Sequence, residues 1–540
     1  MQKINTIIIP SLILSILGNS IPSFAHTTFK KGVQENIYKT YNDPIEKFSF
    51  DELMELSMTS TPQGPLKEKL DGHLGKVFTV NRKFDEPLNK PYVRVAHWNV
   101  ERGFNIEDVA NILSNHKKYE QEVIGFVKKR HKKNFQKELE TLYNTDVISI
   151  NELDIGLPRT NYKNNLKEVA DRLGWNYAYA TEFVEVGDLY SNKIIDKNRY
   201  EGLHGTAILS KYPIISSRVF RLPMAYDWYT WEAKKHLSPL EHARKFTASA
   251  VFKEHLTRKE VRHGGRCVLL SDIKLPNGKV FTVVTTHLED RAFPDVRLNQ
   301  FKALLDQIKD IKNPVILTGD FNTSTTDSAP TSVNKEVFKR LRDPDYIART
   351  VAASFIPGVP FVISPSCIVF SKLIQYKDPF YPHIPIIFPN HERKFYAAIK
   401  DFKFSDGAKF DLSGDRSRSS NGRRGLLANS NQRHWKGFKS TYKLEEPRII
   451  AYFKLDWFFI KPEGEIFKPF NGRTLKTLNL AREGGVSDHN PITVDLELVD
   501  GTAENLMKEY KNQKLSERKR LRAERTFTER LLDKKPSSHS

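Results

Sequence analysis

Short apolar runs separated by polar turns recur along the chain between about residue 92 and residue 498. Each run has seven to ten residues and is rich in β-branched or aromatic side chains, which is typical of β-strands. The clearest runs are YVRVAHWNV (92–100), DVISINEL (146–153), NYAYATEF (176–183), HGTAILS (204–210), CVLLSDIKL (267–275), KVFTVVTTHL (279–288), PVILTGDF (314–321) and ITVDLEL (492–498). The pattern predicts a protein built largely on β-sheets.

Helical spacing appears between these strands. LKEVADRLGW has apolar positions at Leu166, Val169 and Leu173, and FKALLDQIKD repeats the spacing from Phe301 to Ile308. A longer stretch from about Ile106 to Tyr143, dense in Lys and Glu, also favours helix. Because strands and helices alternate, and tight hairpins such as LPNGK join some strands, we expect sheets covered by helices on their outer faces.

The composition adds a preference for anionic partners. Hydrophobic residues make up 39% and charged residues 28% of the 540 positions, which is ordinary for a globular protein, but the formal net charge is +20. A surface this basic favours nucleic acid, anionic lipid or phosphorylated compounds. Charge alone does not choose among them.

The N-terminus has the pattern of a secretory signal peptide. Lys3 precedes an apolar segment from Ile7 to Ile21, and Ser-Phe-Ala follows, which predicts a signal peptide over residues 1–25 that is cut after Ala25. The apolar segment contains Pro10 and Gly18 and is shorter than the ~20 residues that span a bilayer. We therefore expect a secreted or periplasmic protein.

Several other segments carry little chemistry. Residues 26–90 form an N-terminal extension without a recognisable motif, and residues 501–540 read as a basic helical tail. Residues 350–371 are uncharged, but their three prolines argue against a membrane-spanning helix. A buried excursion or a loop on an anionic membrane surface fits them better. Pairing of Cys267 with Cys367 stays open.

The most informative feature is the set of polar residues where strands end. Each alone could cap a turn, but together they offer oxygen ligands for Mg²⁺ or Mn²⁺ and imidazoles for proton transfer. The set comprises Asn99, Glu152, His287, Asp320, Asn322, Asp456, Asp488 and His489. With a basic surface that recruits anions, the set predicts hydrolysis of a phosphate ester.

The same residues, in this order, resemble the endonuclease/exonuclease/phosphatase superfamily, whose members are deoxyribonuclease I-like. The resemblance runs through the motifs N, E, H, GDFN, D and SDH, and ELDIGLPRTNYKNNLKEVADRLGW with YEGLHGTAILSKYPI is similar to an exported bacterial branch. It implies an α+β fold, a four-layer α/β/β/α sandwich of two packed, mainly antiparallel β-sheets flanked by helices. The family domain would span residues 91–500, with an insertion at about 327–452.

The resemblance also implies roles for single residues. Glu152 would be the principal metal ligand, with Asn99 and Asp488 beside it. Asp320 and Asn322 would position or deprotonate the attacking water. His489 would bind the scissile phosphate, with Asp456 orienting it. His287 would be a second histidine with Glu201 as its partner, and Arg266 would bind phosphate.

The substrate is less sharply defined. The favoured reading is a metal-dependent phosphodiester hydrolase, a nuclease that acts on DNA or RNA as a monomer. Asp154 weakens this reading, because pancreatic deoxyribonuclease has an arginine at the matching position and an acid there would repel phosphate. The alternatives are a lipid phosphodiesterase of the sphingomyelinase type and a non-catalytic binding protein for anionic polymers.

Overall fold

A computed structural model describes the chain over most of the predicted family domain. The described residues are 40–41, 45–82, 86–190, 195–233, 260–292, 294–323, 393–411, 440–445, 449–464 and 466–499, with isolated positions between 505 and 519. All the predicted site residues fall within them. The predicted signal peptide, the uncharged stretch 350–371, Cys367 and most of the 327–452 insertion lie outside the described residues.

The larger sheet has nine strands among the described residues. Its order is β1–β2–β5–β6–β4–β3–β16–β15, and β8 pairs with β5. The bounds along that order are β1 Thr40–Tyr41, β2 Val77–Val80, β5 Asn176–Glu185, β6 Leu203–Ser210, β4 Val147–Ile155, β3 Tyr92–Asn99, β16 Ile492–Glu497, β15 Pro469–Thr474 and β8 Arg262–Gly264. Since β2 pairs with β5, the sheet begins before residue 91.

The smaller sheet has five described strands in the order β14–β11–β10–β9–β7. Their bounds are β14 Asp456–Lys461, β11 Val315–Asp320, β10 Val280–His287, β9 Cys267–Lys274 and β7 Ile214–Arg221. A separate hairpin pairs β12 (Tyr442–Glu445) with β13 (Ile449–Phe453). Most neighbours are antiparallel, but β1 with β2, β3 with β4 and β10 with β11 are parallel. The strands predicted from apolar runs are confirmed.

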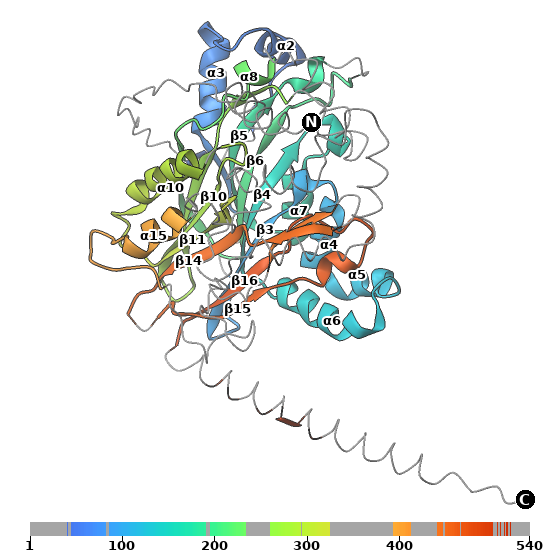
Figure 1. Cartoon of the computed structure of the whole chain (residues 1–540), viewed down its shortest axis with the longest axis vertical. Coiled ribbons are helices and arrows are strands. Elements are labelled where there is room, and N and C mark those ends of the chain that lie inside the picture. Colours follow the sequence, from blue (N-terminus) through green and yellow to red (C-terminus); the bar gives the residue numbers. More distant parts are fainter. Residues whose placement is uncertain are drawn as a thin grey trace, which may run out of the picture. The chain divides into compact units, whose positions relative to one another are not determined.

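Helices cover the outer face of each sheet. On the larger sheet these include α4 (Ile106–Ser114), α5 (His116–Val123), α6 (Lys129–Tyr143) and α7 (Asn165–Leu173), whereas α10 (Pro294–Ile308) and α15 (Arg393–Asp401) lie on the smaller sheet (Figure 1). The other described helices are α2 Phe50–Met58, α3 Gly64–Gly75 and α8 Thr230–Ala233, with the short turns η1 Glu101–Gly103, η2 Pro158–Thr160, η3 Gly187–Tyr190 and η6 Leu478–Leu480. No helix among the described residues is both long and apolar enough to cross a bilayer.

Three apolar layers hold this arrangement together. The middle layer joins the inner faces of the two sheets, through residues such as Val95 and Val147 of the larger sheet and Val283 and Phe458 of the smaller one. The outer two lie beneath the helices. The expected four-layer α/β/β/α sandwich is confirmed, and the core keeps the ends of strands from both sheets in a fixed relation.

The predicted helical stretch from Ile106 to Tyr143 is three helices rather than one. Asn115 ends α4, and its side chain accepts a hydrogen bond from Lys118 N at 3.2 Å, which caps the start of α5. Asn is a favoured N-cap residue because its side chain satisfies a free amide of the first turn. A turn through Gly125 then separates α5 from α6.

Candidate active site

Three of the predicted residues form one row across the end of the smaller sheet. In the strand register, Asp320 at the end of β11 pairs with His287 of β10 on one side and with Asp456 of β14 on the other. Alternate residues of a strand point to opposite faces, and directly paired residues share a face. The register therefore brings together side chains separated by up to 169 positions in the sequence.

The larger sheet contributes Asn99 and Glu152 from neighbouring parallel strands. Asn99 is the last residue of β3 and pairs with Asn151 of β4. Glu152 follows at a bulge in β4 and has φ 62°, a conformation that non-glycine residues seldom adopt. Asn151 Oδ1 accepts a hydrogen bond from Asp320 N at 3.1 Å and so joins the two sheets.

Asn99 connects the two sets of acids. Its amide nitrogen donates to Glu152 Oε1 at 3.0 Å and to Asp320 Oδ2 at 3.1 Å. Its amide oxygen accepts from Glu101 N at 3.1 Å. Asn99 thus contacts the carboxylates through its nitrogen, while its oxygen bonds the backbone of the loop that follows.

The loop after β3 adds an acid that the sequence analysis missed. Asp488 N donates to Glu101 Oε2 at 3.0 Å, and Arg102 N donates to Glu152 Oε2 at 3.1 Å. Burial, with the neighbouring charges of Asp488 and Glu152, raises the pKa of Glu101 to about 8. Burial likewise raises the pKa of Asp488 to about 6. Glu101, Glu152 and Asp488 are therefore close enough for their charges to affect one another.

His489 is held by Asp456, as the resemblance implies. Asp456 Oδ2 accepts from His489 Nδ1 at 2.8 Å, which leaves Nε2 of His489 3.5 Å from Asp320 Oδ2. Burial lowers the pKa of His489, but the carboxylates of Asp456, Asp320 and Asp488 outweigh burial and hold the pKa well above its usual range. His489 is therefore a cation at neutral pH.

A second histidine lies behind Asp456. His97 is fully buried, and its Nε2 lies 3.0 Å from Asp456 Oδ1 while its Nδ1 lies 3.1 Å from Ser149 Oγ. Ser149 in turn contacts Thr285 Oγ1 of the smaller sheet. A hydrogen-bonded chain thus crosses between the sheets directly beneath Asp456 and His489.

His287 is held by an arginine. Arg266 lies 2.9 Å from Nδ1 of His287 and also contacts Glu182 at 2.9 Å. Nε2 of His287 lies 3.6 Å from Asp320 Oδ2 and 3.9 Å from Glu152 Oε1. Burial, followed by the charge of Arg266, lowers the pKa of His287 well below its usual range.

Two expected positions are corrected. Glu201 was expected to support His287, but its carboxylate bonds to Lys47 Nζ at 2.6 Å, while Nδ1 of His287 is taken by Arg266. Arg266 was expected to bind phosphate, yet it is buried among carboxylates and supports His287 instead. Arg266 immediately precedes β9, the strand that pairs with β10, and this position brings its guanidinium to His287 near the end of β10.

Asn322 shapes the loop after Asp320. It has φ 46°, its backbone N–H donates to Asp320 Oδ1 at 2.9 Å, and its side-chain nitrogen donates to Leu288 O at 2.9 Å. Arg297 NH1 in turn donates to the Asn322 carbonyl at 2.5 Å. Asn322 therefore fixes the orientation of Asp320 and of the residues that follow His287.

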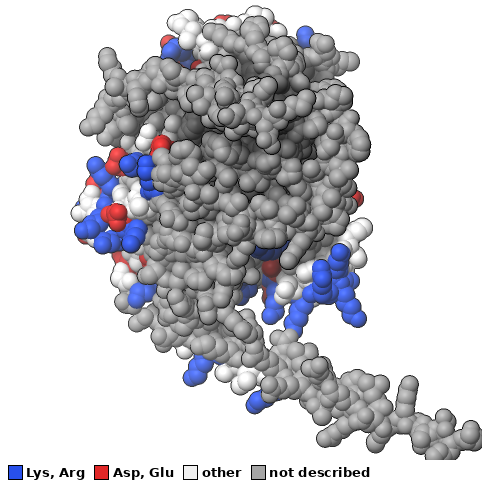
Figure 2. Space-filling view, viewed as in Figure 1, with Lys and Arg blue, Asp and Glu red and all other residues white. Residues whose placement is uncertain are grey.

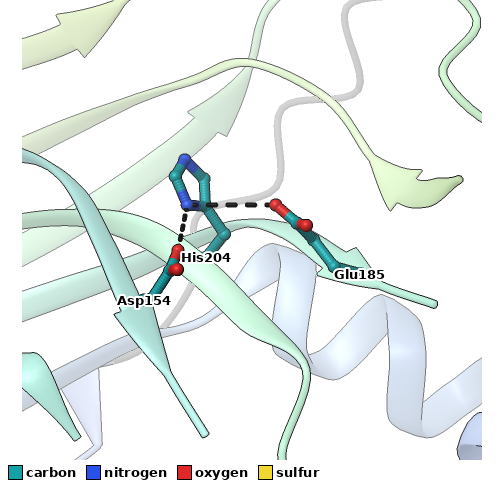
Figure 3. A group of neighbouring side chains, drawn as sticks. All are labelled: Asp154, Glu185 and His204. Atoms are coloured by element: carbon teal, nitrogen blue, oxygen red, sulfur yellow. Dashed lines mark hydrogen bonds and ion pairs between the residues drawn. The ribbon is translucent and has the colours of Figure 1, made fainter. Parts of the chain in front are cut away.

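A second acidic cluster lies near this centre but is already neutralised. Asp154, Glu185 and His204 point toward one another (Figure 3), and their ligand atoms lie within 4.8 Å of each other. Arg159 NH2 lies 2.7 Å from Asp154 and 2.8 Å from Glu185, so a guanidinium stands where a cation would bind. Asp154 is therefore buried and paired, and the expectation that it repels phosphate is wrong.

The acidic group around Glu152 fits a divalent cation. Glu101, Glu152 and Asp488 offer carboxylate oxygens, the ligands that hard cations such as Mg²⁺ prefer. Burial and the mutual repulsion of these acids raise the pKa values of Glu101 and Asp488, so a bound cation would relieve an unfavourable concentration of negative charge. The ligand atoms of Asp320, Asp456 and His489 also lie within 4.8 Å of one another, but His489 Nδ1 is already hydrogen-bonded to Asp456 Oδ2 at 2.8 Å.

Comparison with known proteins places this geometry in a family. A family model described as the Endonuclease/Exonuclease/phosphatase family matches residues 96–489 of the chain, which is well over half of its length. The chain belongs to this family. As a member of the endonuclease/exonuclease/phosphatase family it is a phosphoesterase hydrolase, and the matched range contains every site residue described above.

Three solved structures are similar to the chain at low identity. An endonuclease/exonuclease/phosphatase from Beutenbergia cavernae DSM 12333 is 14% identical with a TM-score of 0.37, and covers 76% of this chain and 72% of that chain. A 3'-5' exonuclease from Neisseria meningitidis is 12% identical with a TM-score of 0.37, over 75% and 100%. A mannosyl-6-phosphatase from Bacteroides thetaiotaomicron is 12% identical with a TM-score of 0.34, over 75% and 99%. No curated protein matches the chain in sequence.

Proposed function

We propose that the protein is a Mg²⁺- or Mn²⁺-dependent phosphodiester hydrolase that acts on nucleic acid by in-line attack of water. The observation that supports this most strongly is the surroundings of Asp320 Oδ2. Asn99 Nδ2 lies 3.1 Å from this oxygen, His489 Nε2 lies at 3.5 Å and His287 Nε2 at 3.6 Å. A proton acceptor thus lies among donors that can bind the oxygens of a phosphate.

The residues that would hold the cation are Glu152, Asp488 and Glu101. When bound, a divalent cation supplies Lewis-acid stabilisation of negative charge on the phosphoryl and leaving oxygens. The hydrogen bonds from Arg102 N to Glu152 and from Asp488 N to Glu101 fix these carboxylates in place. The strained backbone at Glu101, Arg102 and Glu152 is a further sign that the loop serves the site.

Asp320 is suited to accept the proton of the attacking water. Burial raises its pKa to about 7, close to neutral pH, where a general base works most efficiently. The backbone N–H of Asn322 holds Oδ1, so Oδ2 is the oxygen directed at the two histidines. The base is therefore oriented before substrate arrives.

The two histidines would then stabilise the charge that develops on phosphorus. His489, protonated and oriented by Asp456, offers Nε2–H to a phosphoryl oxygen. His287, neutral because its Nδ1 faces Arg266, offers Nε2–H from the opposite side. Preorganised donors of this kind are worth about 10²–10³ in rate each.

Nucleic acid is the proposed substrate because the chain has a formal net charge of +20 and contacts to backbone phosphates need no base specificity. We also propose that the protein is exported, on the strength of the signal-peptide pattern over residues 1–25. Detection of the mature chain beginning near His26 outside the cytoplasm would test export.

A substrate panel tests the proposal. The full chain would be assayed with plasmid DNA, RNA, sphingomyelin and a chromogenic diester, each with Mg²⁺, with Mn²⁺ and with chelator. Cation-dependent turnover of DNA or RNA is the expected result. Turnover of sphingomyelin but not of nucleic acid would replace the substrate, and retention of nucleic acid without turnover under either cation would identify a binding protein.

A further inference from the structure

The turn between α5 and α6 exposes an aromatic residue beside a run of cations. Phe126 is 75% exposed, whereas the next residue, Val127, is buried in the core beneath the helices. Phe126 N donates to Val123 O at 3.0 Å. The buried Val127 anchors the turn, so Phe126 is directed away from the core and does not pack against the protein.

Lys and Arg flank this aromatic residue in the sequence. The segment from Lys117 to Lys137 contains eight Lys and Arg and two Glu, and the six residues after Val127 read KKRHKK. Figure 2 shows Lys and Arg side chains gathered where α6 lies in Figure 1. Lys128, Lys129 and Arg130 are exposed, and none of the three pairs with a carboxylate within the described part of the chain.

These cations lie at the N-terminal end of α6, where the helix dipole makes positive charge unfavourable. Lys128 is the N-cap residue of α6 and makes no capping hydrogen bond, and the first turn has no acidic residue. The helix dipole places partial positive charge at this end, which favours acids and disfavours Lys and Arg. An external anion would therefore be attracted both by the side chains and by the free amides of the first turn.

Contacts with other elements hold α6 in place along its length. Lys90 contacts Asn144 at the C-terminal end of the helix, Arg94 contacts the Thr141 carbonyl, and Thr477 contacts Glu138 further toward the N-terminus. These partners progress from the start of β3 to the segment that leads to Asp488 and His489. Leu480, in the η6 turn after Thr477, is also exposed.

We propose that the α5–α6 turn, residues 123–133, is a docking surface for an anionic lipid bilayer. Cations near an anionic membrane surface bind its headgroups, and an adjoining aromatic side chain can enter the interface. A turn with one exposed aromatic residue beside several exposed cations suits such a surface. The turn is separate in sequence from residues 350–371, and its proposed role does not depend on which phosphodiester is hydrolysed.

Vesicle co-sedimentation of the full chain tests the proposal. Vesicles of phosphatidylcholine with phosphatidylserine are compared with vesicles of phosphatidylcholine alone, for the wild type, Phe126→Ala and the triple variant K128E/K129E/R130E. We expect binding only to the anionic vesicles. Phe126→Ala should weaken it about tenfold, and the triple variant by about 100-fold or more.

The controls separate docking from folding and from catalysis. Glutamates at the start of α6 suit the helix dipole, so the triple variant should stay folded. K302E/K309E/K400E makes the same charge change at exposed lysines elsewhere and should leave vesicle binding within about twofold of wild type. Hydrolysis of a soluble chromogenic diester should be unchanged in all variants, so a failure of docking is distinguishable from a failure of the proposed hydrolysis.

Two results would overturn the proposal. The first is absence of vesicle binding, or binding that the turn variants and the control variant reduce equally. The second is a pair of observations. The triple variant loses affinity for a DNA oligonucleotide as strongly as it does for vesicles, and Phe126→Ala binds vesicles as well as the wild type does. That pattern would assign the cations to nucleic acid.

Discussion

Arg266 donates a hydrogen bond from its guanidinium to Nδ1 of His287 over 2.9 Å. Arg remains protonated in proteins, so Nδ1 must accept and the ring proton must be on Nε2. Nε2, which carries that proton, lies 3.6 Å from Asp320 Oδ2. His287 is therefore a neutral hydrogen-bond donor whose tautomer is fixed by Arg266, a role that a carboxylate partner would not give it.

We predict that His287→Gln retains more activity than His287→Ala, because the Gln amide can replace Nε2–H. His287→Ala should lower kcat by about 10²–10³-fold. Steady-state kinetics on a chromogenic diester would measure the difference. This role would be contradicted if the wild-type rate fell between pH 7 and pH 8 while the rate of His287→Gln stayed constant over the same interval. That pattern would show that His287 loses a proton between pH 7 and pH 8.

His97 should act on catalysis through Asp456. It bonds Asp456 Oδ1 at 3.0 Å while His489 bonds Oδ2 at 2.8 Å, so His97→Phe would leave half of a buried carboxylate unpaired. We expect kcat to fall about 10–100-fold, as for supporting residues in other sites, with KM little changed. His97→Gln, which keeps a donor, should recover part of kcat.

Thermal unfolding of the same two variants is the control. Loss of a partner for a buried polar group costs about 1–3 kcal/mol, so His97→Phe should also be less stable. If kcat of both variants falls only in proportion to the unfolded fraction, His97 is purely structural.

Cation binding should release protons near neutral pH. The pKa of Glu101 is raised to about 8 and that of Asp488 to about 6, so Glu101 is mostly protonated at pH 7 and must lose its proton to a cation. Affinity for Mg²⁺ or Mn²⁺ should therefore rise between pH 6 and pH 8. Isothermal titration in buffers of different ionisation enthalpy would count the protons. Glu101→Gln should abolish most of the release, and a pH-independent affinity in the wild type would refute the linkage.

His73 should make stability depend on pH far from the active site. It is buried between Phe48 and Phe78, and burial lowers its pKa to about 4. Because the unfolded chain binds a proton near pH 6.5 and the native His73 does not, stability is lost as pH falls from about 6.5 to about 4. The loss at pH 5 is roughly 2 kcal/mol.

Denaturant unfolding of His73→Leu at pH 7.5 and pH 5 would isolate this contribution. The variant should lose roughly 2 kcal/mol less than the wild type over that interval. An identical loss in both proteins would assign the pH dependence to other groups.

The sequence identified most of the side chains that the structure brings together in the candidate site, but few of their partners. Asn99, Glu152, Asp320, Asp456 and His489 were visible because polar residues at strand ends interrupt an apolar pattern, and the register then brings them together. The fold class followed from the same alternation.

The supporting contacts depend on geometry that no pattern carries. In the sequence, Glu101 follows a strand and resembles a turn residue. In the structure, its strained backbone directs its carboxylate toward Asp488. His97 occupies an ordinary inward position of β3. Its partner, Asp456, lies on a strand 359 positions later in the sequence. Glu201 and Arg266 were assigned to the wrong partners because their neighbours belong to other elements.

The most direct measurement is the rate of chromogenic phosphodiester hydrolysis by wild type, Glu152→Gln and His489→Gln, before and after chelation and with Mg²⁺ or Mn²⁺ restored. If the residues form one catalytic centre, wild-type turnover stops with chelator and returns with the cation, while both variants remain at least about 10²-fold slower at unchanged melting temperature. Turnover that survives chelation, or that both variants retain, would contradict the assignment.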